Sequence, residues 1–205
     1  EKIRTGHIGL GGMGKRDLQF VMMRDDMQPI AVCDLLHAHM DQAEQIISNK
    51  YGAPSKHVYF EEVIANKDVD AVVIVTPDHW HALPTIMACE AGKDVFVEKP
   101  LTTTIGEGRP IIEAVRRNNR VLQCGNFQRS GAHFQEAVEM IRGGYIGKVA
   151  RCETWIHDNS TVEGIGNPPD EDTPTSPSYR MPVDGLDWDR YIGWTPKVPY
   201  NPNRF

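Results

Sequence analysis

Residues 9–14 read Gly-Leu-Gly-Gly-Met-Gly and come directly after the apolar end of a predicted strand. The G-x-G-x-x-G spacing is typical of the turn between the first strand and first helix of a dinucleotide-binding fold. Gly9 permits the tight turn, Gly11 lets the backbone approach a pyrophosphate, and Gly14 allows the helix to pack closely on the strand. A glycine-rich turn without a ligand has the same pattern, so other features must decide between the two. The loop residues expected to contact a cofactor are Gly9, Gly11, Gly12, Met13 and Gly14.

Length and composition are those of a globular protein. The chain has 205 residues, of which 40% are hydrophobic and 24% charged, enough for one full domain and part of a second. The net charge of -6 and the lack of a basic cluster argue against nucleic acid as a partner. Because no long apolar run is present, we expect no membrane partner either. No signal peptide is visible at the start, so we expect a cytoplasmic protein. Because the chain begins at Glu1 without Met, an exported, periplasmic protein whose leader was removed stays open as the alternative.

The cysteines predict neither a metal site nor a disulfide framework. They are far apart, none forms a C-x-x-C pair, and three fall in strand-like runs. A metal pair of His79 and His81 is disfavoured because residues i and i+2 of a helix do not face each other. We therefore expect no metal and four small, buried side chains at Cys33, Cys89, Cys124 and Cys152.

Strands and helices alternate over residues 3–124. Residues 71–75 read Ala-Val-Val-Ile-Val, a continuous apolar run that suits a parallel strand buried on both faces. This alternation predicts the α/β class, with a Rossmann-type, doubly wound parallel sheet. The predicted strands are Ile3–Gly9, Pro29–Asp34, Val58–Phe60, Asp70–Thr76, Asp94–Val97 and Val121–Cys124. The predicted helices are Met13–Arg24, His37–Tyr51, Glu61–Asn66, His79–Ala91 and Ile105–Asn118, the last irregular and starting only near Gly108.

The pattern changes after residue 124. A helix with Phe134, Val138 and Ile141 on one face is followed by a predicted strand, Lys148–His157, and then by a proline-rich, loop-like stretch. A compact domain seldom ends in such a long irregular segment. We therefore expect an NAD-binding Rossmann domain over 1–125. In 126–205 we expect the beginning of an α+β substrate and oligomerisation domain that is incomplete in this chain.

Asp34 ends the second predicted strand, twenty residues past Gly14. A carboxylate at this spacing bonds the ribose hydroxyls of a dinucleotide and repels a 2′-phosphate, which favours NAD over NADP. Two alternatives stay open at this point. Asp34 is an ordinary turn aspartate in one of them. In the other, the loop and the acid belong to an S-adenosylmethionine methyltransferase, in which a similar pattern occurs.

The ends of the later strands decide between these alternatives. Thr76-Pro77 with His81 follows the fourth predicted strand, and Glu98-Lys99-Pro100 follows the fifth. Ligands bind beyond the carboxyl ends of strands in an open α/β sheet, so both clusters are expected beside the cofactor. With the glycine loop, Asp34 and Gly92-Lys93, they make the chain resemble the N-terminal part of the glucose–fructose oxidoreductase / inositol 2-dehydrogenase / MocA (Gfo/Idh/MocA) family. The resemblance covers nearly the whole chain.

The resemblance implies a role for several residues. Lys99 would be the catalytic residue that touches the reacting hydroxyl or carbonyl, in a pocket withdrawn from water, and we expect the Lys99–Pro100 bond to be cis. Glu98, Thr76 and Pro77 would lie along the nicotinamide ribose, although Glu98 as a plain ion-pair partner stays open. His81 would lie close to the cofactor or pack its helix. The remaining implied contacts are Asn126 and Gln128 to the cofactor, and Arg129, Trp155 and His157 to the substrate.

The function implied by the resemblance is an NAD-dependent oxidoreductase that transfers hydride to or from a sugar, cyclitol or related polyol. Two alternatives are an NAD-dependent glycosidase of the same family, which oxidises its substrate transiently, and a truncated nucleotide-binding fragment without activity. The second catalytic motif of the family, Asp-x-x-x-His, is not found in this chain. Small carbohydrates are the expected partners, and a full-length protein of this kind is expected to form a homo-oligomer.

Overall fold

The computed structural model describes residues 2–155 and 185–200. The chain divides into two compact units. The first holds Glu1–Gly125 together with Val183–Lys197, and the second holds Asn126–Pro182 and Val198–Phe205. In the described part, no helix is long and apolar enough to cross a membrane.

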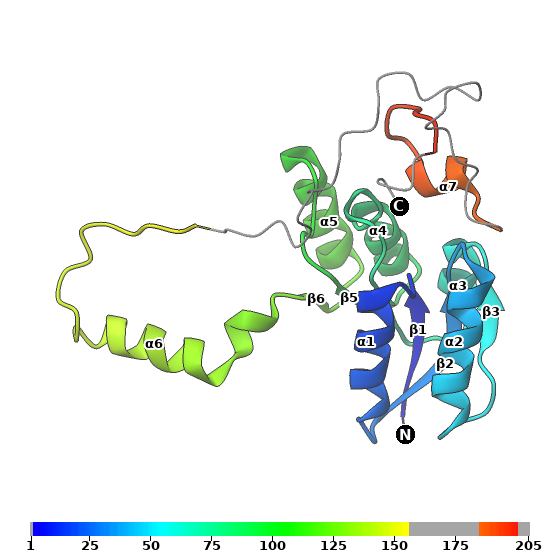
Figure 1. Cartoon of the computed structure of the whole chain (residues 1–205), viewed down its shortest axis with the longest axis horizontal. Coiled ribbons are helices and arrows are strands. Elements are labelled where there is room, and N and C mark those ends of the chain that lie inside the picture. Colours follow the sequence, from blue (N-terminus) through cyan, green and yellow to red (C-terminus); the bar gives the residue numbers. More distant parts are fainter. Residues whose placement is uncertain (1, 156–184, 201–205) are drawn as a thin grey trace. The chain divides into compact units, whose positions relative to one another are not determined.

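The first unit contains a six-stranded, fully parallel sheet with the strand order β3-β2-β1-β4-β5-β6 (Figure 1). The order reverses at β1, from which one half of the sheet extends through β2 and the other through β4. This topology confirms the doubly wound Rossmann-type fold expected from the sequence. The strands are β1 (Ile3–Ile8), β2 (Met27–Cys33), β3 (Ser55–His57), β4 (Ala71–Ile74), β5 (Asp94–Val97) and β6 (Leu122–Cys124).

Helices connect the strands in the expected places. They are α1 (Gly12–Met22), α2 (His37–Ser48), α3 (Phe60–Ala65), α4 (Ala82–Glu90) and α5 (Ile105–Arg117), with a short 3₁₀ turn, η1 (Asp78–Trp80), before α4. The third strand lies three residues earlier than predicted, because Phe60 begins α3 and is buried in the core.

Helix α5 starts at Ile105, so the prediction of a start near Gly108 was wrong. The Glu107 carboxylate accepts hydrogen bonds from the backbone N–H groups of Thr103 and Thr104, at 2.8 and 3.2 Å. This capping box stabilises the N-terminus of α5, so the helix begins at Ile105 although two glycines and Pro110 lie in its first turns.

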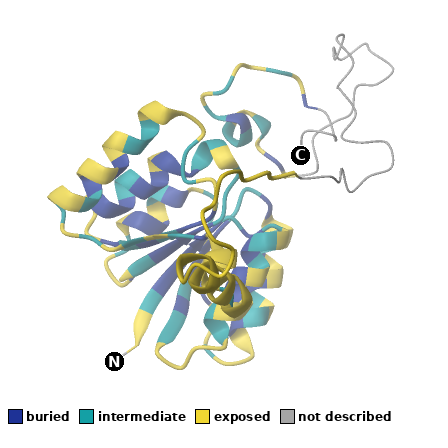
Figure 2. Ribbon diagram, turned by 90° about the vertical axis from the view of Figure 1, so that its left-hand side faces the viewer, coloured by how far each residue is buried: buried dark blue, intermediate teal, exposed yellow. Residues whose placement is uncertain are grey.

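The core has two parts, one on each face of the sheet (Figure 2). Side chains alternate along β2, so that Val32 joins one part while Ala31 and Cys33 join the other. The part on the Val32 side also contains residues of α1 and α2, and the opposite part contains residues of α3, α4 and α5. Both layers hold the strand ends rigidly, which is what positions the loops that follow them.

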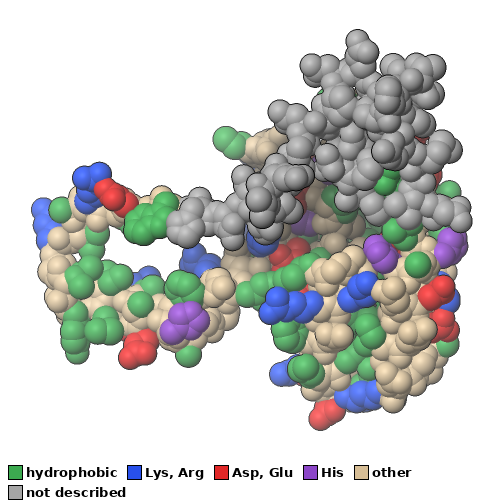
Figure 3. Space-filling view, viewed as in Figure 1, with side chains coloured by type: hydrophobic (Ala, Val, Ile, Leu, Met, Phe, Trp, Pro, Cys, Tyr) green, Lys and Arg blue, Asp and Glu red, His purple; other side chains and the backbone are tan. Residues whose placement is uncertain are grey.

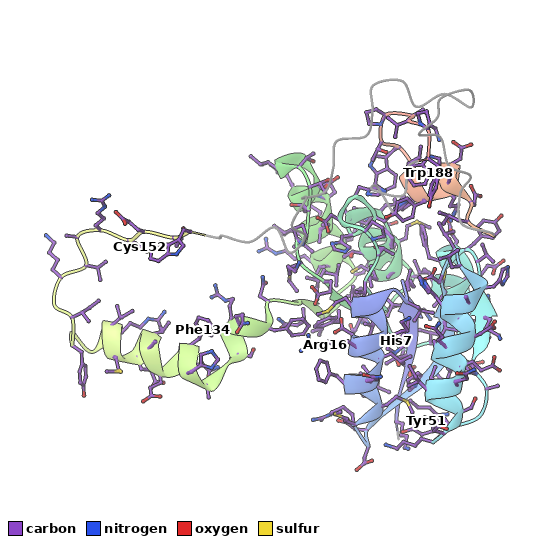
Figure 4. All side chains as sticks on the ribbon, viewed as in Figure 1. His7, Arg16, Tyr51, Phe134, Cys152 and Trp188 are labelled. Carbon is purple, nitrogen blue, oxygen red and sulfur yellow. The ribbon has the colours of Figure 1, made fainter. Side chains whose placement is uncertain are left out.

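Helix α6 (Ala132–Arg142) belongs to the second unit and confirms the helix predicted there. Its hydrophobic side chains stand on the surface (Figures 2 and 3). Phe134 lies on this helix, and Cys152 lies in the extended stretch that follows (Figure 4). The exposed hydrophobic residues of the helix are Phe134, Val138, Met140 and Ile141.

The strand predicted over Lys148–His157 is not formed in its described part, Lys148–Trp155. A strand needs a hydrogen-bonded neighbour, and these residues pair with no other strand of the described chain. The cysteine expectation was also partly wrong. Cys33 and Cys89 are buried, but Cys124 is only half-buried and Cys152 is exposed.

Candidate functional site

The site is built at the carboxyl edge of the sheet, where the parallel strands all end. The residues that follow β1, β2, β4 and β5 are the glycine loop, Asp34, Thr76-Pro77 and Glu98-Lys99-Pro100. Because the strands are parallel, the topology brings these four segments to one edge (Figure 1).

The glycine loop packs backbone against backbone. Gly9 has a φ of +87°, and a Cβ atom there would lie 2.4 Å from the Val75 carbonyl oxygen. A Cβ atom on Gly14 would lie 2.0 Å from the Gly9 carbonyl oxygen. Side chains are therefore excluded at both positions, as the sequence pattern predicted.

The outer side of the same loop is open. A Cβ atom on Gly11 or Gly12 would meet no atom of the described residues within 4 Å. Within the same part of the chain, no side chain caps the N-terminus of α1, and its first turn, which includes Met13, contains no acidic residue. The free N–H groups and the helix dipole therefore suit an anionic group, and the space suits a pyrophosphate. The loop thus fits the dinucleotide that the sequence predicted.

Asp34 ties the glycine loop to the beginning of α2. One carboxylate oxygen accepts a hydrogen bond from the Leu10 N–H at 2.7 Å, and the other accepts one from the Leu36 N–H at 2.9 Å. His39 Nδ1 lies 3.2 Å from the second oxygen. The side chain is 13% exposed, so a carboxylate is fixed beside the loop on the β2 side of the sheet. This is the position that a ribose-binding acid requires.

His81 connects the loops that follow β4 and β5. Its ring is 1% exposed, with Nε2 2.8 Å from the Thr76 carbonyl oxygen and Nδ1 2.5 Å from the Pro100 carbonyl oxygen. Both ring nitrogens thus face backbone of the protein itself. The structure shows a side chain that holds the two loops together, and the contact of His81 with the cofactor stays a prediction. Thr76 and Pro77, both half-buried, form the first of these loops.

Lys99 follows β5 with a cis peptide bond to Pro100, as predicted. Its backbone N–H donates to a Glu98 carboxylate oxygen at 2.9 Å, and the Glu98 N–H donates to the Ile74 carbonyl oxygen at 2.9 Å. The Lys99 side chain is exposed. The water-excluding pocket expected around it is therefore not made by the described residues.

Asp17 is a buried acid that reasoning from the sequence missed. It lies on α1 three residues after Gly14 and is 4% exposed, and Glu98 is 3% exposed. Burial, followed by the charge of Glu98, raises the pKa of Asp17 to about 6, while Arg16 acts in the opposite direction. The available signal was helical spacing, because Gly14, Asp17 and Leu18 share one face.

The remaining residues predicted to contact cofactor or substrate lie in the second unit. Asn126, Gln128 and Arg129 are exposed, the last two within the 3₁₀ turn η2 (Phe127–Ser130). Trp155 is exposed, and His157 lies outside the described residues. The roles of all five stay predictions. Over the described ranges 2–155 and 185–200, no three His, Cys, Asp or Glu side chains are grouped so as to hold a metal ion.

A segment distant in sequence completes the first unit, and reasoning from the sequence did not predict this. Helix α7 (Trp188–Ile192) presents the Tyr191 carbonyl oxygen to His79 Nε2 and to the Trp80 indole N–H, each at 2.8 Å. The rings of Trp80 and Trp194 meet edge-on at 4.4 Å between centroids. Burial, followed by the charge of Asp34, raises the pKa of Tyr191. Helix α7, which carries Trp188 (Figure 4), therefore lies near Asp34, at the ribose end of the site.

The family of the chain follows from its match to a family model. Residues 3–126 match the model described as "Oxidoreductase family, NAD-binding Rossmann fold". The chain belongs to the Gfo/Idh/MocA family. This assignment confirms the resemblance derived from the motifs and makes NAD the cofactor of the fold. It removes the methyltransferase alternative.

Relatives of this Gfo/Idh/MocA chain carry two kinds of name. An alpha-N-acetylgalactosaminidase from Shewanella oneidensis is 30% identical over 164 residues, covering 77% of this chain and 36% of the relative. A scyllo-inositol dehydrogenase from Lactobacillus casei, solved with bound NAD(H) and scyllo-inositol, is 26% identical with a TM-score of 0.65. That match covers 72% of this chain and 43% of the dehydrogenase. The chain therefore spans less than half the length of these relatives.

We expect Asp34→Asn to weaken the preference for NADH over NADPH by at least about tenfold, because a charged hydrogen-bond partner of the ribose is worth roughly 1.5–3 kcal/mol. The substitution also removes the repulsion of a 2′-phosphate. Equilibrium titration with both nucleotides measures this ratio. Asp41→Asn removes one charge from the exposed face of α2 and is the matched control. An unchanged ratio in Asp34→Asn would remove Asp34 from the ribose site.

Proposed function

We propose that this chain provides the NAD-binding half of an oxidoreductase that transfers hydride between a hydroxyl-bearing carbon of a cyclitol, sugar or related polyol and the nicotinamide. One observation carries the proposal. Lys99 follows β5, on the half of the sheet opposite to Asp34, with the glycine loop between them. A dinucleotide whose ribose meets Asp34 and whose pyrophosphate meets the loop extends its nicotinamide toward Lys99.

Bound NAD supplies the hydride acceptor for this chemistry. The protein's own residues bind the substrate oxygen and stabilise it as its proton is lost. In the proposed reaction Lys99 hydrogen-bonds the substrate oxygen and stabilises the negative charge that develops there as the hydroxyl proton passes to solvent. Glu98 fixes the Lys99 backbone by accepting its N–H, and His81 fixes the following carbonyl group. These contacts restrict the loop from which Lys99 projects.

The L. casei dehydrogenase supports a polyol substrate, because its structure contains both NAD(H) and scyllo-inositol. A myo-inositol 2-dehydrogenase from Lactobacillus plantarum adds to this support, with 26% identity and a TM-score of 0.67 over 73% of this chain and 43% of that one. Both resemble this chain in fold, and parallel sheets of this type bind ligands at the carboxyl edge.

A glycosidase is the second candidate, favoured by the S. oneidensis relative named alpha-N-acetylgalactosaminidase. Such a reaction would oxidise the substrate, break the glycosidic bond by elimination, add water to the resulting double bond and return the hydride to the product. Lys99 would again hydrogen-bond the oxygen of the hydroxyl group that is oxidised. No net reduced nicotinamide forms, and this separates the two reactions experimentally.

A panel of inositol isomers, free sugars and aryl glycosides tests the proposal. We expect reduced nicotinamide to accumulate from NAD+ with at least one inositol or sugar. Release of the aryl group without net reduced nicotinamide would replace the dehydrogenase with the glycosidase. Absence of both, in a protein that binds NADH, would contradict catalysis by this chain and leave it as a nucleotide-binding unit.

A further inference from the structure

Two buried carboxylates at the carboxyl edge lack the partners that buried charges normally have. Neither carboxylate oxygen of Asp17 accepts a hydrogen bond from the described residues, and one oxygen of Glu98 is in the same position. The other Glu98 oxygen accepts the Lys99 N–H at 2.9 Å. Buried charges of like sign without donors are unfavourable, so a proton on Asp17 or a nearby positive charge stabilises this arrangement.

The surroundings of the pair offer little compensation. Arg16, labelled in Figure 4, is the cation that acts on Asp17, and it occupies the preceding, exposed position of α1. On the β6 side Glu98 faces Gly125, where a Cβ atom would lie 2.6 Å from the unpartnered oxygen. Burial, followed by the charge of Glu98, raises the pKa of the Cys124 thiol. The space beside the carboxylate is thus bounded by a residue without a side chain.

The position of the pair in the sheet indicates what could approach it. The pyrophosphate-binding loop follows β1, the ribose-binding acid follows β2, and Glu98 follows β5 on the other side of the switch point. The nicotinamide half of a dinucleotide extends over this side. Its ring carries a positive charge in NAD+ and none in NADH.

We propose that the buried acids Asp17 and Glu98 recognise the charge of the oxidised nicotinamide ring, so that NAD+ binds with release of a proton from Asp17 and NADH binds without it. Below about pH 6, Asp17 holds a proton when no positive charge is near. A positive ring favours the fully ionised pair, and the proton passes from Asp17 to solvent. The inference rests on NAD binding at this edge and is independent of which reaction the protein catalyses.

The direction of the pH dependence follows from linkage. The pKa of Asp17 is about 6 before NAD+ binds, and a neighbouring positive charge lowers it. The affinity for NAD+ therefore rises with pH until the pair is ionised in the free protein, and is level above that pH. Groups at the ribose end, such as His39 beside Asp34, affect both nucleotides alike. The pH dependence of the NAD+/NADH affinity ratio therefore reports on Asp17 and Glu98 and not on groups at the ribose end.

The test is equilibrium titration of the protein with NAD+ and NADH between about pH 5 and pH 8. We expect the NAD+/NADH affinity ratio to rise about tenfold over this range in the wild type and to stay level in Asp17→Asn. Asp25→Asn removes an aspartate whose side chain is 98% exposed, and is expected to keep the wild-type profile. A level ratio in the wild type, or an unchanged profile in Asp17→Asn, would overturn the inference.

A second measurement on the wild type does not depend on the folding of a variant. Calorimetric titration near pH 6 in two buffers with different ionisation enthalpies counts the protons released. We expect up to about half a proton with NAD+, because Asp17 is half protonated at this pH in the free protein, and none with NADH. Equal proton release by the two nucleotides would overturn the inference, whereas failure of both to bind would overturn the cofactor site itself.

Discussion

Lys99→Met is expected to lower the turnover of the polyol or glycoside substrate by about 10²–10⁴-fold, the usual contribution of a positioned acid or base. The affinity for NADH should stay within about threefold, because the structure ties the cofactor loop to Asp34 and the Lys99 side chain is exposed. Steady-state kinetics and NADH titration on the same preparation measure the two effects separately.

Lys67→Met is the matched control for Lys99→Met. Lys67 is exposed and lies before β4, at the edge of the sheet opposite to the site. This variant should keep both turnover and NADH affinity. A loss of NADH binding in Lys99→Met, or turnover equal to the wild type, would show that the role proposed for Lys99 is wrong.

Gly14→Ala is expected to weaken NADH binding by at least about 100-fold and to destabilise the first unit by several kcal/mol. The added Cβ atom would lie 2.0 Å from the Gly9 carbonyl oxygen and 2.8 Å from the carbonyl carbon. Both atoms belong to backbone, so the turn and the start of α1 must separate. Separation displaces the N–H groups that the pyrophosphate needs. Thermal unfolding and NADH titration measure the two consequences.

Gly108→Ala provides the comparison for Gly14→Ala. Gly108 also lies within a helix, α5, and a Cβ atom there meets nothing within 4 Å. The same change is expected to leave NADH binding unaltered and to raise stability by up to about 1 kcal/mol. Similar behaviour of the two variants would contradict the close packing of the glycine loop.

Much of the fold was predictable because its determinants are local. Ala71–Ile74 forms a parallel strand with a buried centre, as the apolar run indicated, and Gly9 and Gly14 occupy positions that admit no side chain. The third strand was misplaced since Ser55–His57 is short and polar, whereas the apolar residues after it belong to α3. Edge strands of this kind are defined by pairing with a neighbour, and local pattern does not reveal that pairing.

The parts of the site that escaped prediction depend on contacts between distant segments. Asp17 is an acid on an apolar helix face, and only its proximity to Glu98 reveals a pair. The docking of α7 joins Tyr191 to His79 and Trp80, more than 100 residues apart in sequence. His81 was expected near the cofactor, and its two carbonyl contacts became visible only once the loops after β4 and β5 were placed.

The assignment of this edge as an NAD site is tested most directly by titrating the wild-type protein with NADH and NADPH under identical conditions. Nicotinamide fluorescence reports both. We expect NADH to bind at least about tenfold more tightly than NADPH, because Asp34 presents a fixed carboxylate where the 2′-phosphate would lie. Equal or tighter binding of NADPH, or no binding of either nucleotide, would contradict the site described for Asp34 and the glycine loop.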